Sequence, residues 1–448
     1  MKREPPGIRA VYFGYDLLWR AAIPLLRRNR RLSDGFRSRL GTPPPSRASL
    51  WIQAASVGEA YLAREIMVRL NLGIHPLRVL LTANTRQGLE IHRETADLPL
   101  IRSRGLSTSA GFFPFDRPAI MRQVVRHVRP TVAVFLETEI WPGLLRELRR
   151  WGSRIFIING RLSPRSLERY LLWPTIWAHA APDEVLAVSE EDAVRFQRLF
   201  ARSRIRILPN IKFDRLAPPQ TVTSKEKGAP TPQRPHFAVL GSVRREEEND
   251  AARMIQHILA AVPDAVVGLF PRHLHRVGPW RNRLNRMGIP WILRSAAPGP
   301  CPETAHGVAV VLWDTVGELT SAYGRARAAF VGGSLAPLGG QNFIEPLTVG
   351  VIPVIGPSWE DFRWVGEALF NSGLARIGGD WRAVADHLIQ DLNHPISRKE
   401  VMSLAEEYIS ARKGGASQAC RRIAEALGTS AALHHRRRLQ ATAPRFSR

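Results

Sequence analysis

The chain has 448 residues, and its 64 Lys and Arg against 39 Asp and Glu leave a formal net charge of +25. This length and a hydrophobic fraction of 44% exclude wholesale disorder and predict two or three folded domains. Two cysteines, Cys301 and Cys420, exclude a disulfide scaffold and a four-cysteine zinc site. The charge indicates an anionic partner: a nucleic acid, an anionic membrane surface or a phosphorylated substrate.

Residues 11–26 are the most apolar stretch near the N-terminus, but an Asp, an Arg and a Pro interrupt them. They are too short to span a membrane, and no cleavage site typical of a secretory signal follows. Four arginines between 27 and 31 come next, a pattern typical of a helix lying in a membrane interface. We therefore predict that residues 1–49 form an amphipathic membrane-associating segment. The alternative is an amphipathic helix packed on the folded domain.

From residue 50, short apolar runs alternate with helix-like segments, which predicts parallel, doubly wound sheets. The runs predict an N-terminal Rossmann-like domain over 50–213, and they cover residues 50–55, 78–84, 131–137, 154–160 and 184–189. Residues 214–236 contain five prolines and no apolar period, so we predict a linker there.

The same alternation restarts after the linker and predicts a C-terminal Rossmann-like domain over 237–427. Its apolar runs cover residues 236–242, 265–270, 290–294, 308–314, 328–334 and 351–356. Residues 428–448 carry arginines and no acids, and we predict a disordered basic tail. Because ligands of such sheets bind beyond the carboxyl ends of the strands, the strand-to-helix loops should carry the chemistry.

Three loops of the first domain place charged side chains at or after predicted strands. Glu59 falls in the first turn of a helix, where the dipole keeps a carboxylate ionised, and it is predicted to cap the helix or to act as a general base. Glu137 and Glu139 follow a buried strand and suit positioning of a hydroxyl or a cation, unless they form a solvated turn. Lys212, beside the linker, can reach a substrate phosphate or pair with Asp214.

A glycine-rich run, residues 331–346, follows a predicted strand of the second domain and precedes a helix. Its glycines let backbone N–H groups approach an anion, so we predict a phosphate site in preference to a purely structural turn. Within the run, Glu345 can accept hydrogen bonds from a ribose. Arg272, after another strand, can clamp a phosphate bidentately. Neighbouring His273 and His275 lack a third ligand, which argues against a metal site.

These loops belong to a series of motifs that occur in the order found in one enzyme family. The landmarks include AASVGEA, FFPFDRPA, ETEIWPGLL, INGRLSPRSLERY, NIKFD, PRHLHR, DTVGELTSAYGRA and FVGGSLAPLGGQNFIEP. On these motifs the chain resembles the 3-deoxy-D-manno-oct-2-ulosonic acid (Kdo) transferases, glycosyltransferases of lipopolysaccharide assembly. The resemblance implies the α/β GT-B fold, in which two Rossmann-like, doubly wound domains face a cleft.

The resemblance also implies a reaction and the residues that carry it. The family transfers Kdo from CMP-Kdo to a lipid A precursor, and the implied chemistry is one displacement with inversion and no metal or other cofactor. Glu59 accepts the proton of the acceptor hydroxyl in this scheme, while Glu137 and Lys212 stabilise the transition state. The implied contacts to CMP are Pro271, Arg272, Val316, Gly317, Glu318, Asn342, Phe343, Ile344 and Glu345.

The implied partners are a CMP-sugar donor, a lipid A precursor acceptor and an anionic membrane surface. The implied location is the cytoplasmic face of the bacterial inner membrane, with the protein peripheral or N-terminally anchored. Nucleic acid is not predicted as a partner, because no recognition-helix, RNP or zinc-finger pattern is present.

The sequence departs from the family pattern at two places in the second domain. Residues 241–248 read GSVRREEE where the family often has GSTHEGEE, and Gln341 stands where His is usual. Both departures lie near the presumed donor region. A related transferase that uses another nucleotide sugar is therefore one alternative, and a two-domain sugar-nucleotide epimerase is another.

Overall fold

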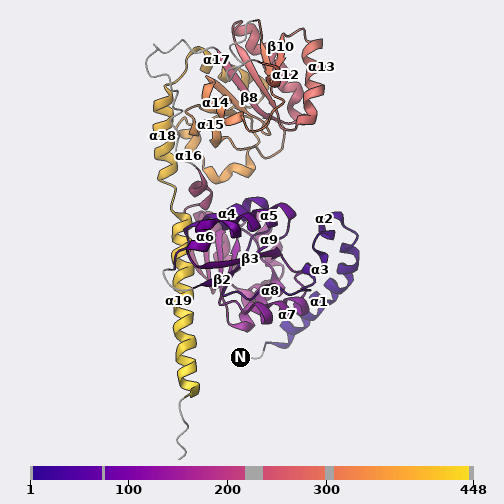
Figure 1. The fold of residues 1–448 in the computed structure, drawn as a ribbon, viewed down its shortest axis with the longest axis vertical. Coiled ribbons are helices and arrows are strands. Elements are labelled where there is room, and N and C mark those ends of the chain that lie inside the picture. Colours follow the sequence, from indigo (N-terminus) through magenta and orange to yellow (C-terminus); the bar gives the residue numbers. More distant parts are fainter. Residues whose placement is uncertain (1–3, 73–75, 217–235, 298–306, 443–448) are drawn as a thin grey trace, which may run out of the picture. The chain divides into compact units, whose positions relative to one another are not determined.

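The chain folds into two compact units whose boundaries differ from the predicted ones (Figure 1). The computed structural model describes residues 4–72, 76–216, 236–297 and 307–442. Unit 1 takes residues 1–215 and 412–448, and unit 2 takes residues 216–411. Most of the predicted linker, residues 217–235, and the last residues, 443–448, lie outside the described residues.

Unit 1 is built on a seven-stranded sheet with the order β3-β2-β1-β4-β5-β6-β7. All neighbouring strands pair in parallel. The strand order reverses between β1 and β4, and ligands of open α/β sheets bind at such switch points. The strands are β1 (Leu50–Gln53), β2 (Leu77–Ala83), β3 (Leu106–Phe112), β4 (Val132–Leu136), β5 (Arg154–Gly160), β6 (Glu184–Ala187) and β7 (Arg204–Ile207).

The helices of unit 1 begin where the sequence offers caps or prolines. Side chains of Ser56, Thr85, Ser163 and Ser189 accept a backbone N–H three residues on, and proline opens several other helices. The helices are α1 (Pro6–Leu26), α2 (Arg30–Ser33), α3 (Phe36–Arg39), α4 (Val57–Arg69), α5 (Arg86–Asp97), α6 (Pro99–Ser103), α7 (Pro118–Val128), α8 (Pro142–Trp151), α9 (Pro164–Leu171), α10 (Pro174–Ala180), α11 (Glu190–Leu199), the 3-10 turn η1 (Ile211–Arg215) and α19 (Gly415–Thr442).

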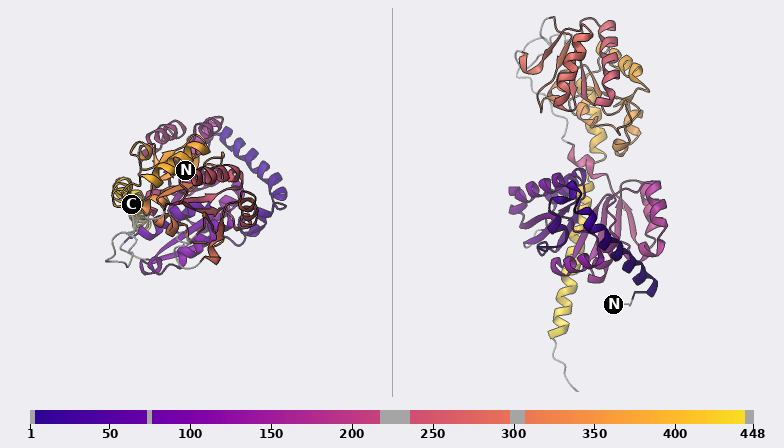
Figure 2. Two further views of the ribbon diagram at one scale, coloured as in Figure 1. Left: turned by 90° about the horizontal axis from the view of Figure 1, so that it is seen from above. Right: turned by 90° about the vertical axis from the view of Figure 1, so that its right-hand side faces the viewer.

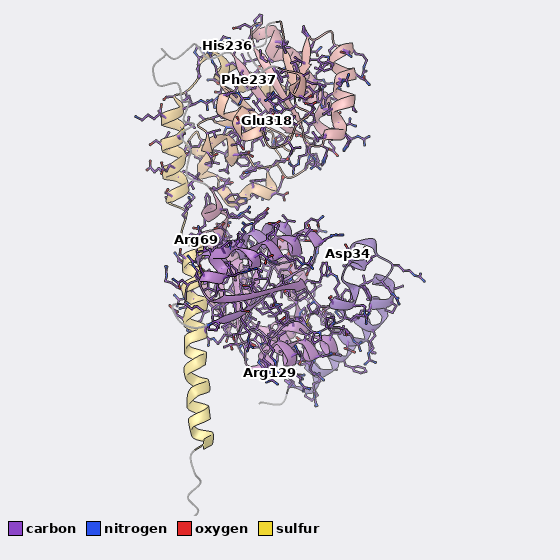
Figure 3. The ribbon with its side chains drawn as sticks, in the orientation of Figure 1. Asp34, Arg69, Arg129, His236, Phe237 and Glu318 are labelled. Atoms are coloured by element: carbon purple, nitrogen blue, oxygen red, sulfur yellow. The ribbon has the colours of Figure 1, made fainter. Side chains whose placement is uncertain are left out.

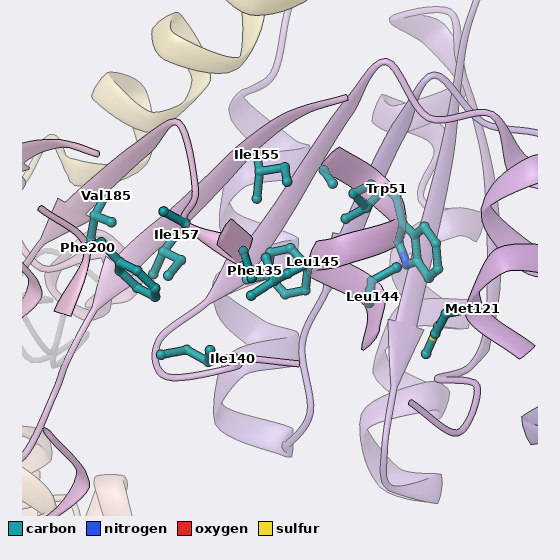
Figure 4. Packing of buried hydrophobic residues seen from close by; sticks show 14 of the residues in the cluster. Trp51, Met121, Phe135, Ile140, Leu144, Leu145, Ile155, Ile157, Val185 and Phe200 are labelled. Atoms are coloured by element: carbon teal, nitrogen blue, oxygen red, sulfur yellow. The ribbon is translucent and has the colours of Figure 1, made fainter. Parts of the chain in front are cut away.

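Alternate side chains of each strand pack on opposite faces of this sheet, because successive residues of a strand point to opposite sides. Trp51 and Phe135 face a cluster that includes α7 and α8, and Figure 4 shows them there with Leu145. Ile52 and Val134 face a second cluster that includes α4 and α19. Helices thus cover both faces, as nearly continuous apolar strands require.

Helix α1 packs on unit 1 with one face and exposes apolar side chains on the other. Tyr12 is buried, and its hydroxyl donates to the carbonyl oxygen of Pro142. The outer face exposes Phe13, Leu18 and Leu25 by 67–70%. No helix among the described residues is long and apolar enough to cross a membrane. The structure therefore places the predicted N-terminal segment within unit 1, where α1 packs as an amphipathic helix.

The C-terminal helix α19 also belongs to unit 1, so the predicted end of the second domain at residue 427 is wrong. Ala416, Ala419 and Ile423 recur at helical spacing and pack in the cluster that α4 lines. Arg422 donates to both carboxylate oxygens of Glu184, which is fully buried on β6. This contact and the apolar stripe attach α19 to the sheet of unit 1.

Helix α19 continues to Thr442 and extends past the body of unit 1 (Figures 1 and 2). The sequence predicts a disordered tail from residue 428, but the structure has helical backbone over 428–442. The reason lies in the composition of this stretch, since its Ala, Leu, Gln and Arg residues have high helix propensity.

Unit 2 repeats the same architecture around a second seven-stranded sheet with the order β10-β11-β9-β8-β12-β13-β14, parallel throughout. Its strand order reverses between β8 and β12. The strands are β8 (Phe237–Val243), β9 (Val266–Pro271), β10 (Trp291–Leu293), β11 (Val310–Leu312), β12 (Ala328–Val331), β13 (Pro353–Ile355) and β14 (Arg376–Ile377). The helices are α12 (Glu248–Ala261), α13 (Val277–Arg286), α14 (Leu319–Arg325), α15 (Ile344–Thr348), α16 (Ala368–Asn371), α17 (Trp381–Asn393) and α18 (Arg398–Ser410).

A hydrophobic cluster of unit 2 is drawn entirely from within the unit. Ala238 and Leu240 of β8 pack there with Ile255 of α12 and Leu388 of α17, and all members fall between residues 238 and 392. Two parallel α/β sheets, one in each unit, confirm the predicted fold class of two Rossmann-like, doubly wound domains.

Candidate active site

The switch point of the unit 1 sheet brings together three predicted residues, two of which follow the neighbouring strands β1 and β4. β1 pairs with β4, and β4 pairs with β5. Glu59 follows β1 at the start of α4, and Glu137 comes directly after β4. Lys212 lies on η1, and its Nζ is 2.8 Å from Glu137 Oε1. The structure thus brings Lys212 to Glu137 beside the strand that leads to Glu59.

The side chain of Glu59 turns back towards the end of β1. The backbone N–H of Ala55 donates to Glu59 Oε2 at 2.5 Å, and the Ser56 hydroxyl donates to Glu59 Oε1 at 3.1 Å. In return, the Glu59 N–H donates to Ser56 Oγ at 3.4 Å. The loop therefore caps α4 and holds the carboxylate in one orientation at the same time.

The environment of Glu59 corrects the prediction that the helix dipole keeps this carboxylate ionised. Burial raises the pKa of Glu59, and the negative charges of Glu139 and Glu137 raise it further. The hydrogen bonds from Ala55 and Ser56 lower it, but the balance leaves the pKa at about 7. A carboxylate whose pKa lies near neutral pH is suited to accept a proton during catalysis.

The ion pair of Lys212 with Glu137 answers one of the alternatives left by the sequence. Lys212 does not pair with Asp214, because both oxygens of Asp214 accept N–H groups at the start of α19, from Gly414 and Ala416, at 2.8 Å each. The Lys212 and Glu137 side chains are only 19% and 18% exposed. The pair is thus largely shielded from water, where charges interact more strongly than at a surface.

A network of polar side chains surrounds Glu139 at the same edge of the sheet. Its Oε2 accepts hydrogen bonds from Trp141 Nε1 at 2.6 Å and Gln53 Nε2 at 3.2 Å. Gln53 also donates to Asn84 Oδ1 at 3.1 Å and accepts from Thr82 Oγ1 at 2.6 Å. Burial raises the pKa of Glu139 despite its hydrogen bonds.

Sequence reasoning singled out Glu139 but missed Gln53 and Asn84. A signal was present, since each is a polar residue inside or at the end of an apolar strand. Such a residue needs a hydrogen-bonding partner when the strand is buried.

The glycine-rich loop of unit 2 is organised by Glu247, which was not predicted as a site residue. The carboxylate of Glu247 is fully buried and accepts the backbone N–H groups of Gly333 at 2.6 Å, Ser334 at 2.8 Å and Leu335 at 2.7 Å. The prediction that this part of the loop cradles a phosphate is therefore wrong, because an anion from the protein already occupies these donors.

The predicted CMP contact Glu318 is engaged within unit 2. Arg294 donates to both of its carboxylate oxygens at 3.0 Å. Burial would raise the pKa of Glu318, but hydrogen bonds from Thr315, Trp313 and Arg294 outweigh burial and hold the pKa below its usual value. The structure thus fixes this side chain at the N-terminus of α14.

The predicted contacts of the second half of the glycine-rich run divide into core and surface. Phe343 and Ile344 bury their side chains, so only their backbone can face a ligand. Asn342 is exposed. Glu345 accepts a hydrogen bond from Thr320 of α14, which ties this run to the helix that follows Glu318.

The remaining predicted contacts lie after β9 and β11, at the same edge of the unit 2 sheet. Pro271 ends β9, and Arg272 exposes its side chain and forms no ion pair with any described residue. Val316 is 81% exposed, and Gly317 takes a left-handed backbone with φ +89°. Because β9 and β11 are neighbours in the sheet, these loops lie near one another.

A metal site is not evident in the part of the chain that the structure describes. No group of three or more His, Cys, Asp or Glu side chains there could hold a metal ion. His273 and His275 stack their rings with centroids 5.5 Å apart, and no third ligand joins them among the described residues.

Comparison with known sequences gives relatives along nearly the whole chain. The profile of a family described as 3-deoxy-D-manno-octulosonic-acid transferase (kdotransferase) matches residues 34–215. The 3-deoxy-D-manno-octulosonic acid transferase of Bordetella pertussis is 30% identical over 433 residues, which is 92% of this chain and 98% of the relative. The protein of the same name from Haemophilus influenzae is 28% identical and covers 87% of this chain and 89% of its own length.

Comparison with solved structures gives weaker likenesses. The C-terminal CMP-Kdo binding domain of WaaA from Acinetobacter baumannii is 24% identical with a TM-score of 0.35, over 39% of this chain and 90% of that domain. UDP-GlcNAc 2-epimerase from Neisseria meningitidis is 11% identical with a TM-score of 0.49, over 85% of this chain and 99% of that protein. Both TM-scores are below 0.5, so the assignment depends on the sequence relatives.

The two α/β units and the sequence relatives define a glycosyltransferase. The particular family follows from the relative that is 30% identical along 98% of its length. The chain belongs to the Kdo transferase family, as its motifs predict, and the alternative of a sugar-nucleotide epimerase is excluded.

Proposed function

We propose that this enzyme transfers Kdo from CMP-Kdo to a hydroxyl of a lipid A precursor, with inversion at the anomeric carbon. The observation that carries the proposal is the switch point of unit 1, where Glu59 has a pKa of about 7 beside the ion pair of Lys212 with Glu137. The acceptor hydroxyl becomes a good nucleophile when a base takes its proton, and Glu59 is the group that can supply this base.

In the proposed step, Glu59 takes the proton of the acceptor hydroxyl as its oxygen bonds to the anomeric carbon of Kdo. The bond from that carbon to the CMP phosphate breaks in the same displacement, and its electron pair leaves with CMP. Lys212, held by Glu137, stabilises charge that develops in the transition state.

For the donor, we propose that CMP binds at the carboxyl edge of the unit 2 sheet. Arg272 supports this assignment, because its exposed guanidinium has no ion-pair partner among the described residues and can neutralise a phosphate. Exposed Asn342 and the open backbone of Val316 and Gly317 lie at the same edge. Since Glu247 occupies the N–H groups of the first part of the glycine-rich loop, the phosphate contact shifts to these groups.

Mass spectrometry of the product tests the proposal. A tetra-acylated lipid A precursor incubated with CMP-Kdo and the enzyme should gain the mass of one or more Kdo residues. The Glu59→Gln variant is the control for a contaminating transferase. An unmodified acceptor, with wild-type enzyme that is folded and binds CMP, would contradict the proposed acceptor.

Donor choice is tested separately. The departures from the family pattern at 241–248 and Gln341 keep open the alternative of a transferase that uses another nucleotide sugar. Gln341 Nε2 donates to the carbonyl oxygen of Ser242 at 2.7 Å, so Gln341 contacts the residue just before the first departure, at Val243. Turnover should be highest with CMP-Kdo in a panel of CMP- and UDP-sugars. Preference for a different sugar would replace the proposed donor and leave the family unchanged.

We also propose that no metal takes part in the reaction. The leaving group, CMP, has a single phosphate, and arginine and lysine side chains can neutralise its charge. Turnover should be the same in EDTA and in added Mg²⁺ after the enzyme has been dialysed against a chelator. A loss in EDTA that Mg²⁺ restores would show that the reaction needs a divalent ion.

For its location, we propose that the enzyme binds the cytoplasmic face of the inner membrane through the outer face of α1. The exposed side chains of Phe13, Leu18 and Leu25 support this, with arginines at residues 27 and 28 next to them. Deleting the segment would also remove Tyr12 from the core, so substitutions of the outer face are the sharper test.

Co-sedimentation with anionic phospholipid vesicles makes the comparison. Replacing Phe13, Leu18 and Leu25 together by Ser should release the enzyme from the vesicles without lowering its thermal stability. The matched control replaces Leu172 and Val194, which are also exposed on unit 1, by Ser and should sediment like the wild type. Equal sedimentation of both variants would refute the role of α1.

A further inference from the structure

Two non-glycine residues with left-handed backbones lie side by side at the carboxyl edge of the unit 1 sheet. Glu137 has φ 54° and Asn159 has φ 59°. The register of β4 and β5 pairs Leu136 with Ile158, so the next residues of both strands are neighbours. Such backbone conformations cost free energy in residues other than glycine, and they concentrate where the surrounding structure and function require them.

Asn159 also marks an irregularity in the sheet. The pairing of β5 with β6 shifts register between Ile158 and Gly160, so Asn159 is the extra residue of a bulge. Bulges redirect a side chain and are common next to active sites. The side chain of Asn159 is fully buried, and its Oδ1 accepts the backbone N–H of Ile211 at 2.9 Å.

That hydrogen bond ends on η1, the turn that carries Lys212. Ile211 is fully buried, and on the following residue the Lys212 N–H donates to Asn210 Oδ1 at 3.0 Å. The backbone that leads into Lys212 is therefore held at two successive N–H groups, by Asn159 at Ile211 and by Asn210 at Lys212. Asn159 supplies the anchor that links η1 to the strand edge where Glu137 stands.

We infer that Asn159 is a positioning residue of the transfer reaction, which holds η1 so that the Lys212 ammonium meets Glu137. The inference deepens the proposed function, because it assumes that Lys212 stabilises the transition state. Asn159 Nδ2 has no hydrogen-bond partner among the described residues, so the Oδ1 bond to Ile211 is the contact that the role requires.

Asn159→Gly is the sharpest variant, because glycine keeps the left-handed backbone and removes only the side chain. Arg129→Gly is its matched control. Arg129, labelled in Figure 3, has φ 57° and is exposed at the end of α7. It precedes β4 and Glu137 follows β4, so the two residues lie at opposite ends of that strand. We expect kcat to fall about 10- to 100-fold in Asn159→Gly, the range that a displaced catalytic group can cost, and to stay at the wild-type value in Arg129→Gly.

A double-mutant cycle separates positioning from general support of the fold. If Asn159 acts through Lys212, adding Asn159→Gly to Lys212→Met should lower kcat by less than about 2-fold beyond Lys212→Met alone. A residue that only stabilises the fold would lower kcat by the same factor in both backgrounds. If the kcat of the double variant equals the product of the two single losses, the inference is overturned.

Chemical modification gives a readout that does not depend on turnover. Reductive methylation followed by peptide mass spectrometry measures the accessibility of Lys212, with exposed Lys399 as the internal reference. Release of η1 should speed methylation of Lys212 relative to Lys399 in Asn159→Gly but not in Arg129→Gly. An unchanged ratio in Asn159→Gly would count against the inference.

The outcomes also distinguish this inference from the proposed function. If Lys212→Met lowers kcat and Asn159→Gly does not, the inference fails and the catalytic role of Lys212 stands. If Lys212→Met turns over like the wild type, the proposed role of Lys212 fails and the inference fails with it.

Discussion

At the scale of single residues, the loop that holds Glu59 combines a helix cap with a raised proton affinity. In an exposed first helical turn, the dipole and the capping hydrogen bonds lower the pKa of a carboxyl group. In this enzyme burial beside Glu139 and Glu137 outweighs them. The sequence predicts the cap, because Ser56 and Glu59 are three residues apart. It does not predict the pKa, because that depends on β4 packing next to β1.

Replacing Glu59 tests the role of the base directly. Glu59→Gln keeps an oxygen for the Ala55 N–H but cannot accept a proton, so turnover should fall by at least about 10²-fold. Steady-state kinetics with CMP-Kdo and the lipid acceptor make the measurement, and circular dichroism checks that the variant is folded. Turnover close to the wild type would remove Glu59 from the mechanism.

The pH dependence of turnover follows from the same pKa. The base must be ionised, so kcat should be high above pH 7 and fall as the pH drops through about 7. The acid limb should be absent from the residual activity of Glu59→Gln. A profile of kcat from pH 5 to 9 checks this, and an acid limb near the usual carboxyl value of 4.5 would contradict it.

Stability should depend on pH in the opposite direction. The folded state binds the Glu59 proton more tightly than the unfolded state, so this group stabilises the fold below pH 4.5 and loses that contribution as the pH rises to about 7. Urea titrations give the free energy of unfolding of Glu59→Gln minus that of the wild type. This difference should be more favourable to the variant at pH 8 than at pH 4. An equal difference at both pH values would show that the carboxyl is not perturbed.

At the scale of elements, a single carboxylate joins the N-terminal helix, a loop and the helix that follows the Glu137 loop. Asp116 is fully buried, and its oxygens accept the N–H groups of Gly143 at 2.8 Å and Leu144 at 2.7 Å, in the first turn of α8. The hydroxyl of Tyr15 on α1 donates to the same carboxylate at 2.9 Å. Asp116 was visible in the sequence only as part of the FFPFDRPA landmark, and its partners are far away along the chain.

Asp116→Ala should lower the free energy of unfolding by about 3 kcal/mol, because it leaves buried donors without an acceptor. The exposed cap Ser163, whose Oγ accepts the Ser166 N–H, gives the contrast: Ser163→Ala should cost only about 1 kcal/mol. Urea titrations of both variants make the comparison. Similar losses would mean that Asp116 contributes no more than an ordinary cap.

The predicted and observed strands show which elements a sequence reveals. The apolar runs of β1, β4, β5 and β8 were predicted because both faces of these strands are buried. Strand β3 reads LSTSAGF and edge strand β7 reads RIRI, so neither forms an apolar run, and both were missed. Strand β14 has two residues and gives no pattern.

The candidate site, like the strands, was predicted only in part. Motifs identified Glu59, Glu137 and Lys212, because each lies in a short continuous motif that can be recognised without knowledge of distant segments. Glu247 and Asn159 were missed, since each acts on a segment that is distant along the chain. The glycine-rich loop was misread for this reason: its partner, Glu247, lies 86 residues before Gly333.

At the scale of the whole molecule, unit 2 is inserted into unit 1. The chain leaves unit 1 after residue 215 and returns at residue 412. Asp214 accepts the N–H groups of Gly414 and Ala416, so the outgoing and returning segments of unit 1 are held together.

Fragments should behave according to these boundaries. Residues 236–411 should fold alone with a cooperative thermal transition, because a hydrophobic cluster of unit 2 is complete within them. Residues 1–215 should not, because α19 covers one face of their sheet. Joining residue 215 to 412–428 through a short glycine-serine linker should restore folding. Cooperative unfolding of residues 1–215 alone, measured by circular dichroism, would contradict this.

The insertion has a consequence for the order of events on the ribosome. Unit 2 is fully synthesised before α19 exists, so the second unit can mature while the first still waits for its last helix. The delay spans the 411 − 215 = 196 residues of unit 2, whose synthesis takes about 10 to 40 s at ordinary translation rates. During that interval the nascent first unit exposes the apolar face that α19 later covers, and this is the stage at which a chaperone would bind.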